Sequence, residues 1–256
     1  MKKILLLITT AIALGLAPTF AQPGPSGDGQ QGPHFDGAVS ELFGTNQSFS
    51  AMMEYQTFGR NGGYITMSGK FSFDNGKSRF EMNTSEMQGS PILPGATARM
   101  KSMGMDRMIS ITRPDLKLAY IVYPDLNSYA VMTQQYSSAS SAAANFKIET
   151  TELGKETVDG HECVKNKVVV IDKEGNKHES TGWNATDLKK FPVKIAMNED
   201  GRSVRMLFKD ISFGKPAASN FEPPTGLTKY DDVQTMIRTE MMKKRGGGLS
   251  APPQQN

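Results

Sequence analysis

The chain has 256 residues, with 29 Lys and Arg against 26 Asp and Glu, and a single cysteine. This near-balance of charge argues against a nucleic-acid partner, because phosphate contacts need a basic patch. The lone Cys163 excludes an intramolecular disulfide, although a disulfide between two chains stays open. We expect Cys163 to be buried and inert, since free cysteine is among the most buried residue types.

The first 21 residues have the pattern of a cleaved signal peptide. Lys2 and Lys3 precede an apolar run over residues 4–16, and Ala21 offers a small residue before the expected cleavage. The run is short for a membrane span, although an uncleaved anchor stays open. No Cys directly follows the apolar run, so the sequence lacks the signal for bacterial lipoprotein processing. We therefore predict an exported protein, periplasmic or otherwise, that is not integral to the membrane after cleavage.

Two stretches of low apolar content frame the rest of the chain. Residues 22–37 and residues 246–256 are rich in Gly, Pro and Gln, which is typical of a disordered arm and a disordered tail. Residues 38–245 are predicted to form one domain. A short helix over residues 36–43 is expected to open it, with Gly44 as the stop.

Turn signals between short alternating runs dominate the middle of the chain. Asn75-Gly76, Asp159-Gly160 and similar dipeptides accept the positive φ that tight hairpins require. Eleven strands are predicted, near residues 48–58, 63–73, 77–84, 105–113, 117–123, 128–133, 146–153, 161–172, 177–185, 192–198 and 202–213. Most alternate apolar and polar residues, so one face of the sheet is packed and the other is wet.

Three segments depart from this alternation. The run 117–123 is apolar on both faces, so we expect it to be covered on both sides. Residues 85–103 are irregular. Residues 137–145, rich in Ser and Ala, fit a flexible loop better than a weak helix.

A helix is predicted at the end of the domain, with Asp231 or Asp232 as its cap and Gly246 as its stop. Its apolar stripe consists of Val233, Met236, Ile237 and Met241. This stripe is suited to cover part of the sheet. The predicted class is therefore mainly β with a few helices (α+β), a large curved antiparallel sheet in the form of a half-barrel, covered by short helices.

Catalysis has weak support in the sequence. His161 and Cys163 share a strand face at a spacing of two, so a thiol–imidazole pair is geometrically conceivable. No nucleophile elbow, HExxH or P-loop accompanies it. We predict that the protein is not an enzyme and that it holds no cofactor.

The sequence contains 16 methionines. Met100, Met103, Met105 and Met108 are clustered, and thioether sulfur is a soft ligand that selects Cu(I). The alternative interpretation is plastic packing, since methionine fills irregular gaps in apolar cores. We favour packing, because most of the other methionines lie at inward strand positions, and we predict no metal site.

Several stretches together resemble exported proteins of the LolA-like superfamily, whose members include a lipoprotein carrier and its acceptor. They are FSFDNGKSRFEM (71–82), MISITRPDLKLAYIVYPDLNSYAVM (108–132), ELGKETVDGHECVKNKVVV (152–170), FPVKIAM (191–197) and FEPPTGLTKY (221–230). The resemblance covers about residues 48–230 and points to an uncharacterised exported branch. It implies an unclosed antiparallel barrel, capped by helices, with an apolar hollow for acyl chains.

From the resemblance and the alternation together, we predict a non-enzymatic protein that binds a lipid or the acyl chains of a lipoprotein. The predicted lining is apolar and consists of Met53, Tyr55, Met67, Phe71, Phe73, Phe80, Met82, Ile109, Ile111, Tyr120 and Val122. Two other functions stay open: a Cu(I)-binding protein that uses the methionine cluster, and an envelope sensor or scaffold that binds a protein partner. A filled core is the alternative to a ligand site, because periodicity does not report volume.

Overall fold

The computed structural model describes residues 37–58, 63–90, 95–133, 146–172, 175–199 and 202–246. The chain divides into two units, residues 1–31 and 32–256, and all described residues belong to the second. The predicted signal peptide, the predicted loop over 137–145, and nearly all of the predicted arm and tail lie outside the described residues.

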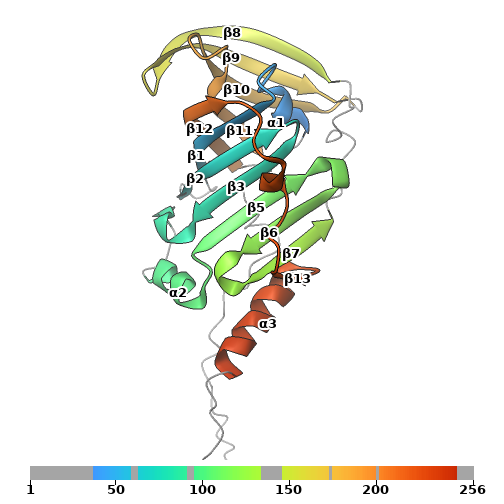
Figure 1. The fold of residues 1–256 in the computed structure, drawn as a ribbon. Helices are drawn as coiled ribbons and strands as arrows, with labels where there is room; N and C mark the ends of the chain where they lie inside the picture. Colours follow the sequence, from blue (N-terminus) through green and yellow to red (C-terminus); the bar gives the residue numbers. More distant parts are fainter. Residues whose placement is uncertain are drawn as a thin grey trace, which may run out of the picture. The chain divides into compact units, whose positions relative to one another are not determined.

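One sheet of thirteen strands forms the framework (Figure 1). Its longer strands are β1 (Ser48–Phe58), β2 (Tyr64–Asp74), β3 (Lys77–Asn83), β5 (Arg107–Arg113), β6 (Leu118–Tyr123), β7 (Ser128–Thr133), β8 (Lys147–Val158), β9 (His161–Ile171), β10 (Lys177–Ala185), β11 (Pro192–Glu199) and β12 (Arg202–Phe213). Two short strands, β4 (Gln88–Ser90) and β13 (Thr228–Tyr230), complete it. The helices are α1 (Gly37–Glu41), α2 (Ala96–Met103) and α3 (Val233–Gly246), with single 3-10 turns η1 (Thr84–Glu86), η2 (Pro114–Leu116), η3 (Pro124–Leu126) and η5 (Ala218–Phe221).

All eleven predicted strands are present, within a few residues of their predicted bounds. The sequence prediction missed β4 and β13, which have three residues each and too little alternation to register. It also missed α2, which has no buried residue and so no apolar stripe to predict it. Instead, α2 is bounded by Gly95 and Gly104, both at positive φ, and the Gly104 N–H closes the last turn.

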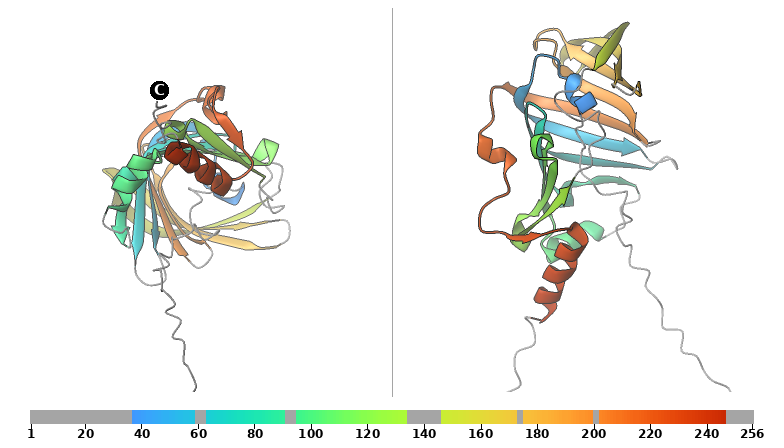
Figure 2. Two further views of the ribbon diagram at one scale, coloured as in Figure 1. Left: turned by 90° about the horizontal axis from the view of Figure 1, so that it is seen from below. Right: turned by 90° about the vertical axis from the view of Figure 1, so that its right-hand side faces the viewer.

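The sheet order is β13-β7-β6-β5-β3-β2-β1-β12-β11-β10-β9-β8, with β4 paired to β2. Every pairing is antiparallel except that of β13 with β7. The sheet curves strongly (Figure 2), which confirms the predicted mainly β, half-barrel class. A close backbone approach marks the bend at Gly69 in β2, where an added Cβ would lie 2.2 Å from the Glu81 carbonyl oxygen.

Two apolar clusters lie on opposite faces of this sheet. The larger one occupies the inner face, where it includes Val39 of α1, Phe43 of the turn that follows α1, and Met236 of α3. The smaller one joins Ile109, Ile111, Tyr120 and Val122 to Phe221 on the outer face. Because successive residues of a strand point to opposite faces, β6 contributes to both clusters and is buried from Ala119 to Tyr123. The prediction that this strand is covered on both sides is confirmed.

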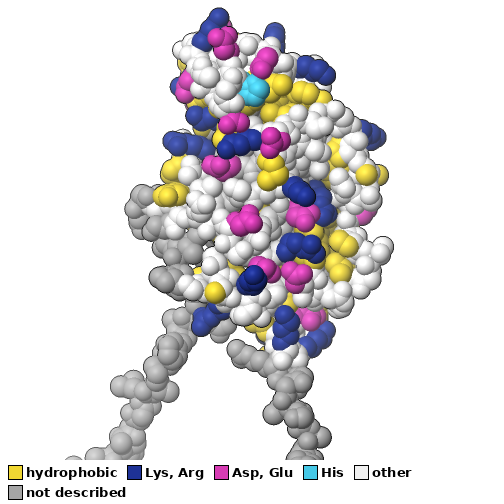
Figure 3. Space-filling view, turned by 60° about the vertical axis from the view of Figure 1, so that its left-hand side comes forward, with side chains coloured by type: hydrophobic (Ala, Val, Ile, Leu, Met, Phe, Trp, Pro, Cys, Tyr) yellow, Lys and Arg dark blue, Asp and Glu magenta, His cyan; other side chains and the backbone are white. Residues whose placement is uncertain are grey.

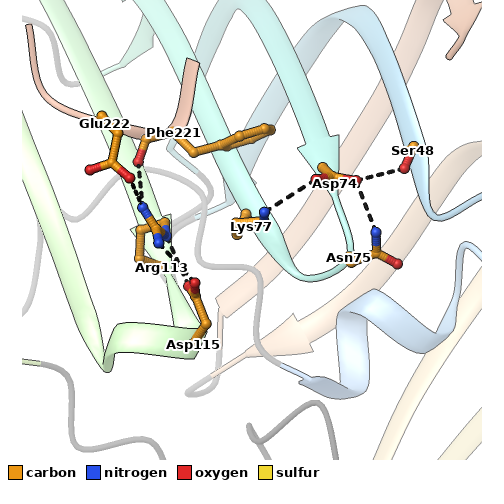
Figure 4. A network of polar contacts seen from close by, with 8 residues as sticks. All are labelled: Ser48, Asp74, Asn75, Lys77, Arg113, Asp115, Phe221 and Glu222. Atoms are coloured by element: carbon orange, nitrogen blue, oxygen red, sulfur yellow. Dashed lines mark hydrogen bonds and ion pairs between the residues drawn. The ribbon is translucent and has the colours of Figure 1, made fainter. Parts of the chain in front are cut away.

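A connecting segment, residues 214–227, crosses the outer face on the side opposite α1 (Figure 2). Arg113 holds it in place by pairing with Glu222 and donating to the Phe221 carbonyl oxygen at 3.3 Å, while Asp115 orients Arg113 (Figure 4). The Lys77 ammonium lies 5.5 Å from the centre of the Phe221 ring. This segment therefore carries the chain from β12 to β13 and determines where α3 begins.

Lys77 also joins a buried carboxylate at the β2–β3 turn. Asp74 accepts from Ser48 at 2.7 Å and from Asn75 at 2.9 Å, and its side chain is only 3% exposed (Figure 4). Burial alone would raise the pKa of Asp74. The Ser48 hydroxyl and the Lys77 ammonium outweigh burial and lower that pKa. The carboxylate therefore stays ionised and fixes this turn to the start of β1.

Among the described helices, none combines the length and the apolar character that a membrane crossing requires.

Candidate functional site

A phenylalanine cluster occupies the part of the inner face near the start of β1 and the end of β2. It consists of Phe43, Phe49, Phe71, Phe73, Phe191 and Phe208, each at most 1% exposed. The ring centroids of neighbouring members lie between 4.8 and 6.4 Å apart, in edge-to-face, tilted and stacked pairs. Such contacts add to area burial and fix ring orientations. This half of the inner face is therefore a solid core.

Further along the same strands, methionine dominates the inner face. The strand register places Met53, Gly69, Met82 and Met108 in one row across β1, β2, β3 and β5. Met67 lies in the next row, opposite Tyr55. We define the methionine region as Met53, Met67, Met82, Met87, Met105, Met108 and Met236, all members of the inner apolar cluster or packed against it.

The methionine region is less completely covered than the phenylalanine cluster. Met67, Met87 and Met105 are only partly buried, and Met87 and Met105 come from the irregular segments that flank η1 and α2. The Thr84 hydroxyl donates to the Met105 carbonyl oxygen at 3.0 Å, which ties these two segments together. Methionine has three rotatable bonds and a polarisable sulfur, so this half can repack around a guest at low cost.

One buried phenol lies in this apolar surrounding. Tyr123 is 9% exposed, and its hydroxyl donates to the Met108 sulfur at 3.6 Å. Burial raises the pKa of Tyr123 to about 12, so the phenol stays protonated. A thioether is a weak acceptor. The Tyr123 hydroxyl is therefore a donor that a carbonyl or carboxylate oxygen would satisfy better.

Helix α3 closes this end of the inner face. Glu240 accepts from Ser128 at 3.1 Å, from Tyr230 at 2.5 Å and from Lys243 at 2.9 Å. Burial alone would raise the pKa of Glu240, but these donors lower it, so the carboxylate is ionised. At the far end of the helix, the Lys244 ammonium donates to the Met103 carbonyl oxygen at 2.9 Å.

The start of α3 is as predicted, since the Asp232 carboxylate accepts from the Thr235 N–H at 2.7 Å. Of the predicted stripe, Met236 is fully buried, and Val233 and Ile237 pack against the inner cluster. The helix is therefore a polar-anchored cover at the β7–β13 end of the sheet.

The predicted lining residues fall into two groups. Those on the inner face are Met53, Tyr55, Met67, Phe71, Phe73, Phe80 and Met82, and the inner cluster brings them together. The other four, Ile109, Ile111, Tyr120 and Val122, pack under Phe221 on the outer face. One ligand on one face cannot touch both groups. The sequence list joined them because β6 is apolar on both faces, so alternation does not show which face of β5 and β6 is the inner one.

Sequence reasoning left several inner-face residues of this part of the sheet out of the lining. Among them are Met87, Met105, Met108, Tyr123 and Met236. Met87 and Met105 lie outside regular strands, where period-two alternation gives no signal. Tyr123 is the last residue of β6, and its side chain points away from those of Tyr120 and Val122. This alternation is the one signal that could have placed Tyr123 on the inner face.

The structure separates the four methionines of the predicted Cu(I) alternative. Met100 and Met103 lie on α2, which has no buried residue, whereas Met108 is buried and accepts the hydrogen bond from Tyr123. Met105 packs against the inner cluster. Within the described residues, no group of three or more His, Cys, Asp and Glu side chains could hold a metal ion. The Cu(I) alternative stays a prediction.

The thiol–imidazole pair is not formed in this structure. The His161 imidazole pairs with Asp187 at 2.7 Å, and the Cys163 thiol donates to the His161 carbonyl oxygen at 3.4 Å. Burial raises the pKa of Cys163, so the thiol is protonated and a poor nucleophile. Cys163 is buried, as predicted.

No protein-family model matches the chain, and no curated protein matches it. Several solved structures are similar in fold. A LolA superfamily protein from Nitrosomonas europaea, NE2245, is 8% identical, with a TM-score of 0.36, and the match covers 73% of this chain and 94% of that one. The lipoprotein LppX of Mycobacterium tuberculosis is 12% identical, with a TM-score of 0.38, and the match covers 74% and 96%.

The protein LprF of Mycobacterium bovis is 11% identical, with a TM-score of 0.35, and the match covers 71% of this chain and 96% of that one. The likeness is distant, and no ligand passes from these proteins to this chain.

Proposed function

We propose that this protein is an exported, non-enzymatic binder of an apolar ligand, and that the ligand is an acyl chain held in the methionine region. The observation that carries the proposal is the contrast within one face of the sheet. The phenylalanine cluster is closed, whereas Met67, Met87 and Met105 are partly exposed at the same apolar cluster as Tyr123, a buried donor whose hydrogen-bond partner among the described residues is a sulfur.

The chemistry of this region suits an acyl chain. Thioether side chains adapt to an irregular hydrocarbon shape, and small-ligand sites are mostly apolar with a few polar groups that fix orientation. In this region, Tyr123 is the polar group. Its hydroxyl would donate to the carboxylate of a fatty acid or to the ester carbonyl of a lipid or lipoprotein.

The proposal that the protein is exported rests on residues 1–21, which have a basic start, an apolar run and a small residue before the expected cleavage site. An exported acyl binder needs a cover that shields the chain from water. Helix α3, anchored through Glu240 and Lys244, is placed to act as that cover.

The first test is mass spectrometry of the protein purified without detergent from its native envelope, followed by titration of the delipidated protein with palmitate. We expect co-purifying acyl material and saturable binding of palmitate. A native protein free of acyl material that also fails to bind palmitate would contradict the proposal.

The second test uses Tyr123→Phe, which keeps the ring and removes the donor. A neutral hydrogen bond is worth about 1 kcal/mol, so palmitate should bind about fivefold more weakly while hexadecane binds unchanged. The matched control is Tyr129→Phe, because Tyr129 packs against the outer cluster and should leave both affinities unaltered. Equal losses of palmitate affinity in both variants would show that the Tyr123 hydroxyl does not contact the ligand.

A further inference from the structure

A separate cavity of about 260 Å³ lies beside the turn between β8 and β9, against strand positions that alternate with Met53, Tyr55 and Ile195 of the inner cluster. Its lining consists of Glu54, Gln56, Val158, Asp159, Lys194, Arg205, Met206 and Leu207. The register places Lys194, Leu207 and Glu54 in one row across β11, β12 and β1, with Arg205 and Gln56 in the next row. This volume gives room for a small polar molecule.

The two cations of this cavity are held by aromatic rings. The Lys194 ammonium lies 4.1 Å from the centre of the Trp183 ring, and the Arg205 guanidinium lies 4.6 Å from the centre of the Phe58 ring. In the described part of the chain, neither side chain forms an ion pair. A ring face orients a cation without using its N–H donors on a carboxylate. Both side chains therefore keep donors for a ligand.

Nearby lysines behave differently. Lys165 pairs with Glu156 at 3.4 Å, and Lys167 pairs with Glu179 at 2.9 Å. Basic and acidic side chains are interspersed in this way over the face shown in Figure 3. Lys194 and Arg205 thus differ from these neighbours, because neither forms an ion pair in the described part of the chain, although Lys194 is close enough to Glu156 to help lower the pKa of that carboxyl.

The cavity also contains two acids, Glu54 and Asp159. The Glu54 carboxylate lies 3.9 Å from the Lys209 ammonium on the neighbouring strand. A bare anion would meet these carboxylates without any hydrogen bond to offset the repulsion. A molecule that carries both an anionic group and hydroxyl donors satisfies the cations and the acids together.

We propose that this cavity binds a small phosphate ester that carries hydroxyl groups, of the glycerol phosphate type. The phosphate accepts from Lys194 and from the forked donors of Arg205. The hydroxyls donate to Glu54 and Asp159, and Leu207 and Val158 contact the carbon chain. The same group occurs as a free solute and as the headgroup of a phospholipid. The inference does not depend on the acyl site, because the cavity shares no residue with the methionine region.

The chain contains one tryptophan, and the Lys194 ammonium of this cavity lies over its ring, so Trp183 fluorescence reports on that contact. We expect sn-glycerol 3-phosphate to change the emission saturably, because the ligand withdraws the Lys194 ammonium from the ring. Inorganic phosphate, which has no carbon-borne hydroxyls, should bind more weakly. A response to vesicles that contain phosphatidylglycerol, and none to pure phosphatidylcholine, would identify the headgroup as the source; a response to the solute alone would identify the free ester.

Arg205→Gln removes one of the two cations and leaves the lysine–tryptophan reporter in place. Glycerol phosphate should then bind about tenfold more weakly or worse, since charge-assisted hydrogen bonds are the strong ones. Lys229→Gln is the matched control, because it removes one exposed positive charge from β13 at the opposite end of the sheet order. Unfolding in urea should show the same midpoint for both variants. Absence of binding in every arm, or equal binding by Arg205→Gln and the parent protein, would overturn the proposal.

Discussion

The two halves of the inner face are built from the same strands but differ in their side chains. The phenylalanine cluster packs six rings against one another with almost no exposure. The methionine region, one or two rows further along β1, β2 and β3, has flexible thioethers, of which three are partly exposed. The difference teaches that one continuous sheet can hold a rigid core and an adaptable surface side by side.

The covers follow the same division. Over the phenylalanine cluster, the turn that follows α1 inserts Phe43 between Phe49 and Phe73, with centroid distances of 4.9 Å to both. Over the other half, α3 is anchored by polar groups around Glu240 and by Lys244. An apolar cover is locked by packing, whereas a polar anchor can exchange its partners for water. The second half is therefore the one suited to open.

The largest expected effect comes from breaking the rigid half. Phe49→Ala should lower the free energy of unfolding by about 3–5 kcal/mol, because it leaves a cavity that the surrounding rings cannot fill. Urea denaturation measures this loss. Tyr64→Ala, at a site 42% exposed, is the control and should change stability by about 0.5 kcal/mol or less. A loss below about 1 kcal/mol for Phe49→Ala would show that the ring cluster relaxes, and the contrast between the halves would fail.

A smaller effect is expected at the anchor of α3. Glu240→Gln should lower the free energy of unfolding at neutral pH by about 1 kcal/mol, because it weakens three hydrogen bonds to a carboxylate. Hydrogen exchange should speed up in α3 more than in β1 or β2. Uniform exchange across α3 and the central strands would mean that the helix is not a separate cover.

The anchor also predicts a pH dependence. The pKa of Glu240 is lower in the folded protein than its ordinary value, so the contribution of this carboxylate is complete above about pH 4.3 and is lost as the pH falls through the folded pKa. In Glu240→Gln this part of the acid sensitivity should disappear. An unchanged acid profile would assign the sensitivity to other carboxylates, such as Asp74.

The smallest effect on stability is expected in the adaptable half. Met82→Leu keeps the volume and should cost less than about 1.5 kcal/mol. It should weaken palmitate binding even so, because leucine has fewer rotatable bonds with which to follow the chain. Palmitate titration and urea denaturation of the same variant separate the effect on binding from the effect on stability. Unchanged palmitate affinity would show that the flexibility of this thioether is not used.

Local sequence determined the strands and their turns. Hairpin signals such as Asn75-Gly76 and Asp159-Gly160 are read within a few residues, and both turns adopt the positive φ that these residue pairs favour. The bounds of β1, β7, β10 and β12 match the predicted runs because alternation ends where the turns begin. The cap at Asp232 and the burial of Cys163 were predictable for the same local or compositional reasons.

The sequence did not determine which residues share a site. Ile109 and Met82 are both apolar residues of neighbouring strands, yet they lie on opposite faces, because the register pairs Met82 with Met108 and Ile109 with Glu81. The pairing of Tyr123 with Met108, 15 positions away, depends on how β6 lies beside β5. The placing of Lys194 over Trp183 likewise needs the β10–β11 register. Periodicity fixes where a strand runs, whereas the twist, register and covers of the sheet decide what its side chains meet.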